Sequence, residues 1–220
     1  MIITYLSAPF CNIQVQHSLE RWLLWVEELA ENDYVIIDDF LDEELFRKIM
    51  AHCSRHLPDF TQAGIGSLGD FTIQEGIRGD RTYWLERSRD IDLRAFWDLV
   101  DEAIHIMNRY CYLSISDSEF HLAHYPKGSF YDRHLDQFAG RNNRMISMVI
   151  YLNELWQPGD GGELEIFRDD DSVIVEPLAK RCALFKSADV PHQVLMAHKN
   201  RFSLTGWLLY QPVGLGQFLG

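Results

Sequence analysis

The sequence has few cysteines, and none of them lie close together. The four are Cys11, Cys53, Cys111 and Cys182, with no CxxC pair and no spacing typical of a metal site. Scattered cysteines in a chain of this size indicate reduced, mostly buried thiols in a cytosolic protein. We therefore expect neither a disulfide framework nor a metal held by cysteine.

Long apolar runs are also missing. No stretch approaches the roughly 20 apolar residues that are needed to span a bilayer. The first six residues lack the basic start and the long apolar segment of a secretion signal. The sequence therefore predicts a soluble, cytoplasmic protein with no membrane partner.

Positive charge is scarce. Lys and Arg together number 20 against 33 Asp and Glu, and the formal net charge is −13 at pH 7. Such a surface repels phosphate backbones, so we expect no nucleic-acid partner, whereas a basic peptide or protein would be attracted. An acidic surface that only serves solubility is the alternative.

Repeats, low-complexity segments and Pro/Gly-rich linkers do not occur either. What the chain does have is 220 residues, of which 47% are hydrophobic, enough for one domain with a substantial core. We therefore predict a single domain over residues 1–220.

Hydrophobic periodicity divides this domain into two parts. The first part shows the helical period over residues 18–30, 42–56 and 93–110, short strands at 34–37 and 83–85, and a glycine-rich loop at 64–79. The second part shows short strands at 120–125, 133–136, 145–152, 163–167, 173–175, 181–185, 192–195 and 202–209. Many short strands at such spacing are typical of a jelly roll. We predict an α+β fold, a double-stranded β-helix (jelly roll) at about 118–210 that helices in 17–112 buttress from outside.

The strongest chemical signal is His134-x-Asp136, followed far downstream by His192 and Arg201. Residues i and i+2 of a strand point to the same face, so the imidazole and the carboxylate converge. Two histidines and one carboxylate form the facial triad of non-haem Fe(II) oxygenases, which leaves coordination positions open. Arg201 supplies a planar guanidinium for the carboxylate of a co-substrate.

The other histidines give weaker signals. His52 and His56 are four residues apart on an expected helix and could hold zinc, but no third ligand accompanies them, so we expect a solvated helix face. His121 and His124 fall on opposite faces of a strand and cannot share a metal. Of these two, we expect His124 to lie in the core or in a pocket wall.

Several motifs carry a family resemblance. They are Arg78-Gly79-Asp80 with Trp84, Tyr125-Pro126, Tyr131-x-x-His134-x-Asp136, Tyr151-Leu152-Asn153-x-x-Trp156, Gly161-Gly162-x-Leu164-x-Ile166-Phe167, Phe185-x-Ser187 with Pro191-His192-x-Val194, and Arg201-x-x-x-Thr205-x-Trp207. In these motifs the chain resembles the 2-oxoglutarate- and Fe(II)-dependent prolyl 4-hydroxylases of the hypoxia-sensing type and their bacterial relatives. The resemblance extends over residues 20–210.

This resemblance implies roles for individual residues. His134, Asp136 and His192 would hold Fe(II), and with Arg201 they would form the catalytic set. Arg201, Tyr151, Thr205 and Tyr125 would bind 2-oxoglutarate, the co-substrate that is used together with O2. The substrate would meet Arg78, Asp80 and Trp84 in a closing loop, and Tyr131 and Trp207 in the pocket wall. Ascorbate is implied as a reductant.

The resemblance further implies hydroxylation of a prolyl residue in a protein, with release of succinate and CO2. Elongation factor Tu is the leading candidate substrate by analogy with bacterial relatives. Hydroxylation of a free amino acid or another small molecule is the nearest alternative. A non-catalytic peptide-binding module is the alternative from a different class, although it would have little need for the triad and Arg201.

Overall fold

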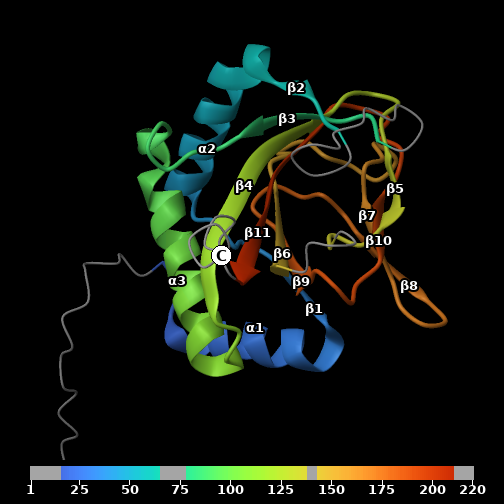
Figure 1. The fold of residues 1–220 in the computed structure, drawn as a ribbon. Helices are drawn as coiled ribbons and strands as arrows, with labels where there is room; N and C mark the ends of the chain where they lie inside the picture. The colour runs from blue at the N-terminus through green and yellow to red at the C-terminus, as the bar shows by residue number, and fades with distance from the viewer. Residues whose placement is uncertain (1–15, 65–77, 138–142, 211–220) are drawn as a thin grey trace, which may run out of the picture.

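The computed structural model describes residues 16–64, 78–137 and 143–210 (Figure 1). Cys11 and most of the expected loop at 64–79 fall outside these ranges. The helices are α1 (Leu19–Asn32), α2 (Glu43–His56) and α3 (Arg94–Cys111), with short 3-10 helices η1 (Leu57–Asp59) and η2 (Ile91–Leu93). The strands are β1 (Tyr34–Ile37), β2 (Thr61–Gln62), β3 (Arg81–Trp84), β4 (Ile115–Tyr125), β5 (Tyr131–His134), β6 (Arg144–Tyr151), β7 (Leu164–Phe167), β8 (Ser172–Val175), β9 (Cys182–Lys186), β10 (His192–Val194) and β11 (Arg201–Tyr210).

Two antiparallel sheets face each other. The larger has the strand order β1-β9-β6-β11-β4-β3-β2, and the smaller has the order β5-β10-β7-β8. The helices lie on the outer side of the large sheet, and the small sheet lies on its other side (Figure 1). The predicted jelly roll with supporting helices is confirmed.

Alternation along the central strands explains why the large sheet has two buried faces. On β11, Leu204 and Leu208 join the core beneath the helices. Neighbouring positions of the same sheet, among them Val149 and Tyr151 of β6, point instead to the core between the two sheets. Arg201 and Thr205 of β11 lie on this inner side too, in a cavity that they share with Val149. A polar residue at such a position is therefore placed inside the jelly roll, next to whatever the cavity holds.

The helices begin at residues that the sequence indicates. The Asp42 carboxylate accepts a hydrogen bond of 2.7 Å from the backbone N–H of Leu45, and the Ser18 hydroxyl accepts one of 3.3 Å from Arg21. These are ordinary N-caps, which satisfy backbone N–H groups that have no partner inside the helix.

Strand β4 is longer than predicted. It begins at Ile115 rather than at residue 120, because residues 115–119 pair with the end of β11 although they show no clear alternation. The two-residue strand β2 was also not expected, since pairing with β3 alone defines it. Both differences come from long-range pairing that local patterning does not report.

The remaining global predictions concern thiols and membranes. In the described ranges Cys53, Cys111 and Cys182 are all free, and Cys53 and Cys182 are buried. Across residues 16–64, 78–137 and 143–210, no helix combines the length and the apolar character needed to cross a bilayer.

Candidate active site

Strand pairing brings His134, Asp136 and His192 together inside the jelly roll. In the ladder between β5 and β10, His192 lies directly opposite His134. Asp136 follows just after the end of β5. Its Oδ1 lies 3.5 Å from Nε2 of His134 and 3.7 Å from Nε2 of His192. One ligand atom from each residue fits within a 4.8 Å span.

The backbone sets the tautomer of both imidazoles. Nδ1 of His134 lies 2.7 Å from the carbonyl oxygen of Asp132, and Nδ1 of His192 lies 3.0 Å from that of Val190. A carbonyl oxygen only accepts, so in each ring Nδ1 is the donor. The Nε2 lone pairs are then free to face Asp136, which is the arrangement that metal-bound histidines need.

The Asp136 carboxylate is buried and held from behind. Its Oδ2 accepts a hydrogen bond of 2.5 Å from the Ser147 hydroxyl, which lies 2.8 Å from that of Ser187. Burial opposes ionisation of Asp136, but the neighbouring His192 and His134 outweigh it and hold the pKa of this carboxyl well below its usual range. Burial lowers the pKa of His192 and so favours its neutral form. A carboxylate and a neutral imidazole are the protonation states that a metal ligand requires.

Arg201 lies deeper in the same cavity. It is 3% exposed, donates from Nε to the Gly162 carbonyl oxygen at 3.2 Å, and donates from Nη1 to the Ser203 hydroxyl at 2.9 Å. Its guanidinium carbon lies 4.8 Å from the ring centre of Tyr125 and 5.2 Å from that of Tyr151. No carboxylate in the described ranges pairs with it. A buried cation in this state is prepared for an anionic ligand.

Two hydroxyls accompany this guanidinium. The Tyr151 side chain is fully buried, and its hydroxyl has no hydrogen-bond partner within the described residues. The Thr205 hydroxyl lies 3.1 Å from that of Ser203, and Thr205 lines the same cavity as Arg201. Burial without a partner is costly for a hydroxyl, so Tyr151 is placed to bond a ligand beside Arg201.

Gly162 makes room for Arg201. Its φ is +78°, a left-handed conformation that favours glycine, and an added Cβ would lie 3.0 Å from Cγ of Arg201. The second glycine of the Gly161-Gly162 motif is therefore required by the backbone conformation and by the close approach of Arg201.

Arg78 forms part of the outer wall and is paired with Asp80. Arg78 donates to the two carboxylate oxygens of Asp80 at 2.7 and 2.6 Å, and Asp80 is only 1% exposed. The guanidinium carbon of Arg78 lies 4.3 Å from the ring centre of Tyr131. Tyr131 in turn stacks on His134, with ring centres 3.7 Å apart. This ion pair therefore supports an aromatic side chain that contacts the triad.

Trp84 and Trp207 lie on the same outer side. Their ring centres are 6.2 Å apart, and His121 lies between them at 4.8 Å from Trp84 and 5.5 Å from Trp207. Trp207 is buried, whereas 46% of Trp84 is exposed. An outer cleft lined by both tryptophans, Arg78 and Tyr131 shares His134 and Asp136 with the inner cavity that contains Arg201. His134 and Asp136 thus lie where an inner chamber, which contains Arg201, adjoins the outer cleft.

For three residues of this region the sequence predicted no role at the site. Ser147 supports Asp136 as described, and its signal is a lone hydroxyl on the inner face of the apolar strand β6. Arg144 donates to the backbone carbonyl of Asp136 at 3.1 Å, and its guanidinium carbon lies 3.4 Å from the ring centre of Trp207. His121 is buried in the cavity wall, where burial, with the positive charge of Arg78, lowers its pKa to about 3.

One histidine prediction is narrowed and one is corrected. Of the two places expected for His124, the pocket wall is taken by His121, whereas His124 points to the opposite side of β4 and stacks on Phe202 at the edge of the helix-side core. The expectation of a solvated face for His52 and His56 is wrong, since His52 is 1% exposed and both rings have carboxylate partners.

The donor set fits the metal and co-substrate that the sequence suggests. Two imidazoles and one carboxylate on one side of a cavity are suitable ligands for Fe(II), and the remaining side stays open. The unpaired Arg201 and the unsatisfied Tyr151 hydroxyl suit a carboxylate at the inner end of the cavity.

Comparisons with known proteins agree with this geometry. A family model described as the 2OG-Fe(II) oxygenase superfamily matches residues 120–209. A prolyl-4-hydroxylase from Pseudomonas putida is 36% identical, covers 87% of this chain and 100% of its own, and superposes with a TM-score of 0.79. A prolyl hydroxylase from Trichoplax adhaerens, solved with a peptide fragment of the hypoxia inducible factor oxygen degradation domain, is 25% identical with a TM-score of 0.76, covering 90% of this chain and 96% of its own.

A more distant structure shows the fold alone. A prolyl 4-hydroxylase from Phytophthora capsici is 22% identical, covers 91% of this chain and 68% of its own, and gives a TM-score of 0.69.

The Pseudomonas protein is more than 30% identical over its full length, and the family model matches as well. The chain therefore belongs to the 2OG-Fe(II) oxygenase superfamily and is a dioxygenase that uses Fe(II), 2-oxoglutarate and O2.

Proposed function

We propose that this enzyme hydroxylates a prolyl residue in a protein substrate. The observation that carries the proposal is the outer cleft, which is lined by His134 and Asp136 but not by Arg201 and holds the half-exposed Trp84. Similarity to the Pseudomonas prolyl-4-hydroxylase over the whole of that chain supports the same reading.

The triad is assigned to iron. His134 and His192 would each hold Fe(II) through Nε2, and Asp136 would hold it through one carboxylate oxygen. When bound, Fe(II) with 2-oxoglutarate and O2 supplies the oxidising chemistry that inserts one oxygen atom into a C–H bond, with release of succinate and CO2. The protein's own contribution is to hold three ligands on one side and to keep bulk water away.

The inner chamber is assigned to the co-substrate. Arg201 pairs with the far carboxylate of 2-oxoglutarate, and the Tyr151 hydroxyl donates to the same group. Thr205 adds a hydroxyl at the second inner position of β11 after Arg201, beyond Ser203. Tyr125 packs against the guanidinium and limits its rotation. These four residues orient the co-substrate so that its other end meets the triad.

The outer cleft is assigned to the substrate. Trp84, Trp207 and Tyr131 offer flat apolar surface for a pyrrolidine ring and its neighbours. The ion pair between Arg78 and Asp80 holds Tyr131 in place and belongs to the segment that closes over the peptide. Closure there would shield the reaction from water.

The proposed partner is a protein rather than a free amino acid. The Trichoplax enzyme was solved with a peptide fragment, and a cleft open to solvent can admit a chain that continues on both sides of the target. A net charge of −13 favours a basic segment. Elongation factor Tu is the first substrate to test, because the resemblance to bacterial members implies it.

The test is a modification assay on whole proteins. The enzyme is loaded with Fe(II) and 2-oxoglutarate without oxygen, mixed with elongation factor Tu or a cell lysate, and exposed to air with and without ascorbate. We expect mass spectrometry to find one added oxygen atom on a defined proline. Asp136→Ala, checked for folding by circular dichroism, is the inactive control.

Other outcomes separate the alternatives. Succinate formation without any modified protein would point to a small-molecule substrate and contradict the protein assignment. No succinate, and no binding of 2-oxoglutarate with Mn(II) as an iron surrogate, would contradict the assigned roles and leave a peptide-binding module.

A further inference from the structure

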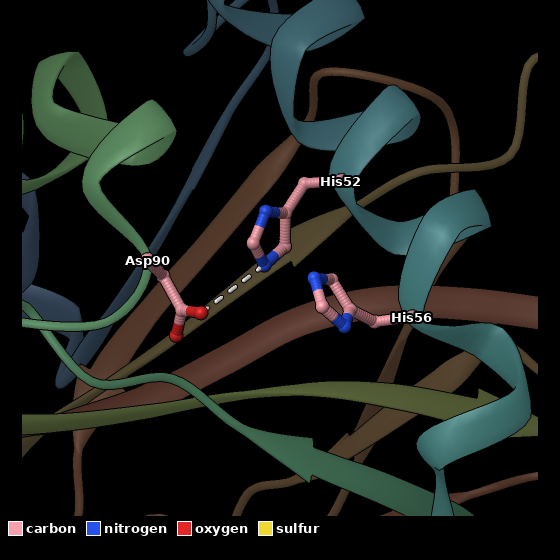
Figure 2. Close-up of side chains that lie close together, drawn as sticks. All are labelled: His52, His56 and Asp90. Carbon is pink, nitrogen blue, oxygen red and sulfur yellow. Dashed lines mark ion pairs between the residues drawn. The ribbon is translucent and has the colours of Figure 1, made fainter.

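A second group of metal-type side chains lies away from the triad, between α2 and the turn that follows β3. His52 and His56 are four residues apart on α2, so one turn of helix brings both imidazoles to the same face. Asp90, at the start of η2, faces them from the other side (Figure 2). One ligand atom from each of the three fits within 4.8 Å, and none of them belongs to the iron triad.

His52 points an unsatisfied nitrogen into this group. Its side chain is 1% exposed, and its Nε2 has no hydrogen-bond partner within the described residues. The same atom lies 3.7 Å from Oδ1 of Asp90, which is too far for a hydrogen bond (Figure 2). A buried imidazole nitrogen is costly in this state, so the site lacks one interaction that a ligand would supply.

The far nitrogens of both rings bind carboxylates. Nδ1 of His52 lies 3.0 Å from Oδ2 of Asp92, and Nδ1 of His56 lies 3.0 Å from Oδ2 of Asp59. A carboxylate acceptor holds the ring proton on Nδ1 and directs the Nε2 lone pair away from it. Carboxylate–histidine pairs of this kind support the ligands of many protein zinc sites and increase the basicity of the ring.

Asp90 is fixed by hydrogen bonds and turns its Oδ1 toward His52. Its Oδ2 accepts from the backbone N–H of Glu86 at 2.8 Å and from Arg89 at 2.9 Å, and its Oδ1 accepts from Nε of Arg89 at 3.0 Å. Oδ1, the oxygen nearest His52, also accepts from the Tyr83 hydroxyl at 3.4 Å, and a bound cation would replace this long hydrogen bond.

His52 and Asp90 need only a small contraction, and the ligand atom of His56 lies within 4.8 Å of both. Ligand atoms around a tetrahedral zinc ion lie roughly 3.4 Å apart, against 3.7 Å between His52 and Asp90. The His56 side chain is 25% exposed, so solvent reaches the group and a water molecule can complete the coordination. Two imidazoles and a carboxylate without a thiolate suit a borderline divalent ion.

We propose that His52, His56 and Asp90 bind a second divalent metal ion, with zinc as the preferred ion, separate from the catalytic iron. The ion joins α2 to the turn between β3 and η2. Since β3 ends at Trp84, the ion would also fasten the strand that carries the exposed tryptophan of the outer cleft. The role is structural, because none of these ligands lines the cavities at the triad.

The experiment counts bound metal in the full chain. Purified protein freed of metal is titrated with zinc alone against a chromophoric chelator. We expect two equivalents for the unaltered chain and one for His134→Ala/Asp136→Ala, in which the iron triad is disabled. In that background, His56→Phe keeps the ring stacking on Tyr83 but removes the ligand nitrogens, and the remaining equivalent should be lost.

Matched variants make the result specific. His198→Phe replaces an exposed histidine outside both groups and should leave the stoichiometry unchanged. Asp59→Asn weakens the carboxylate support of His56 and should lower zinc affinity about tenfold. If the triad variant does not fold, His56→Phe is made in the unaltered chain instead. The unaltered chain should then bind two equivalents of zinc and the His56→Phe variant one. An unchanged stoichiometry in His56→Phe, or no zinc bound once the triad is disabled, overturns the proposal.

Discussion

The hydroxyl of Ser147 donates a hydrogen bond of 2.5 Å to Oδ2 of Asp136, and this bond leaves Oδ1 as the oxygen that faces both imidazoles. Ser147 lies on β6 and Asp136 lies beyond β5, so strands of the two different sheets cooperate to orient one carboxylate. Partners of this kind fix the ligand before the metal arrives.

Replacing Ser147 with Ala should lower the affinity for Fe(II) by about ten- to a hundredfold, because Asp136 loses the donor that orients it. The measurement is an anaerobic Fe(II) titration of the enzyme. Ser172→Ala, which alters a hydroxyl on β8, is the control and should leave the affinity unchanged. Equal iron affinity in both variants would contradict the supporting role of Ser147.

Replacing Tyr151 with Phe should raise the KM for 2-oxoglutarate about five- to tenfold, which corresponds to one hydrogen bond of about 1 kcal/mol. Iron affinity should not change. The stability of the free protein should not fall, because the lost hydroxyl has no partner within the described residues. Steady-state kinetics and urea unfolding measure the two effects. A destabilised variant with normal KM would show that the hydroxyl serves the fold instead.

Replacing Gly162 with Ala should weaken 2-oxoglutarate binding through Arg201. The new methyl group meets Cγ of Arg201 at 3.0 Å and also strains a backbone with φ of +78°. We expect a loss of about 1–3 kcal/mol in stability and a KM for 2-oxoglutarate that rises more than that for the substrate. Gly128→Ala also has positive φ (+90°) but meets nothing within 4 Å, so it separates backbone strain from the contact with Arg201. Identical KM values for 2-oxoglutarate in the two variants would show that backbone strain, and not the contact with Arg201, causes the effect.

Replacing Trp84 with Ala should raise the KM for a peptide or protein substrate about tenfold, as expected for removal of an aromatic contact that binding would bury. The slow turnover of 2-oxoglutarate without substrate should remain, because Trp84 contacts neither Arg201 nor Tyr151. Leu155→Ala, at a side chain that is 87% exposed, is the control. If the Trp84 variant lost substrate-free turnover as much as it lost turnover with substrate, Trp84 would act on 2-oxoglutarate and not on the substrate.

Stability should depend on pH through His121. Burial lowers its pKa from 6.5 to about 3, so between these values the unfolded chain binds a proton that the folded chain does not. The contribution of His121 to the free energy of unfolding is therefore fully present above pH 6.5. It falls by about 1.4 kcal/mol for each pH unit below that value. His121→Phe, which keeps an aromatic ring between Trp84 and Trp207, should lose about 2–3 kcal/mol less between about pH 7 and pH 4.5. Urea unfolding at several pH values tests this, and parallel curves for the two proteins would contradict it.

The sequence by itself determined the elements and the chemistry of the ligands. Periodicity placed all three helices and the eight short strands of the second half, because alternation reports burial on one side of a strand. The strand expected at 133–136 is β5 at 131–134, so Asp136 lies beyond it and not on the same strand as His134. The order His134-x-Asp136, His192, Arg201 indicated an iron site, since few other combinations of residue types suit an open metal and an anion.

Tertiary structure alone decided which polar side chains support that site. His121 rather than His124 faces the cavity, Ser147 orients Asp136, and Arg144 joins Asp136 to Trp207. Each of these contacts joins residues from different strands or from opposite sides of a turn, and the register that aligns them depends on the packing of the whole sheet. The same reason applies to His52 and His56, whose third neighbour Asp90 lies far along the chain and comes close only when α2 packs against the turn after β3.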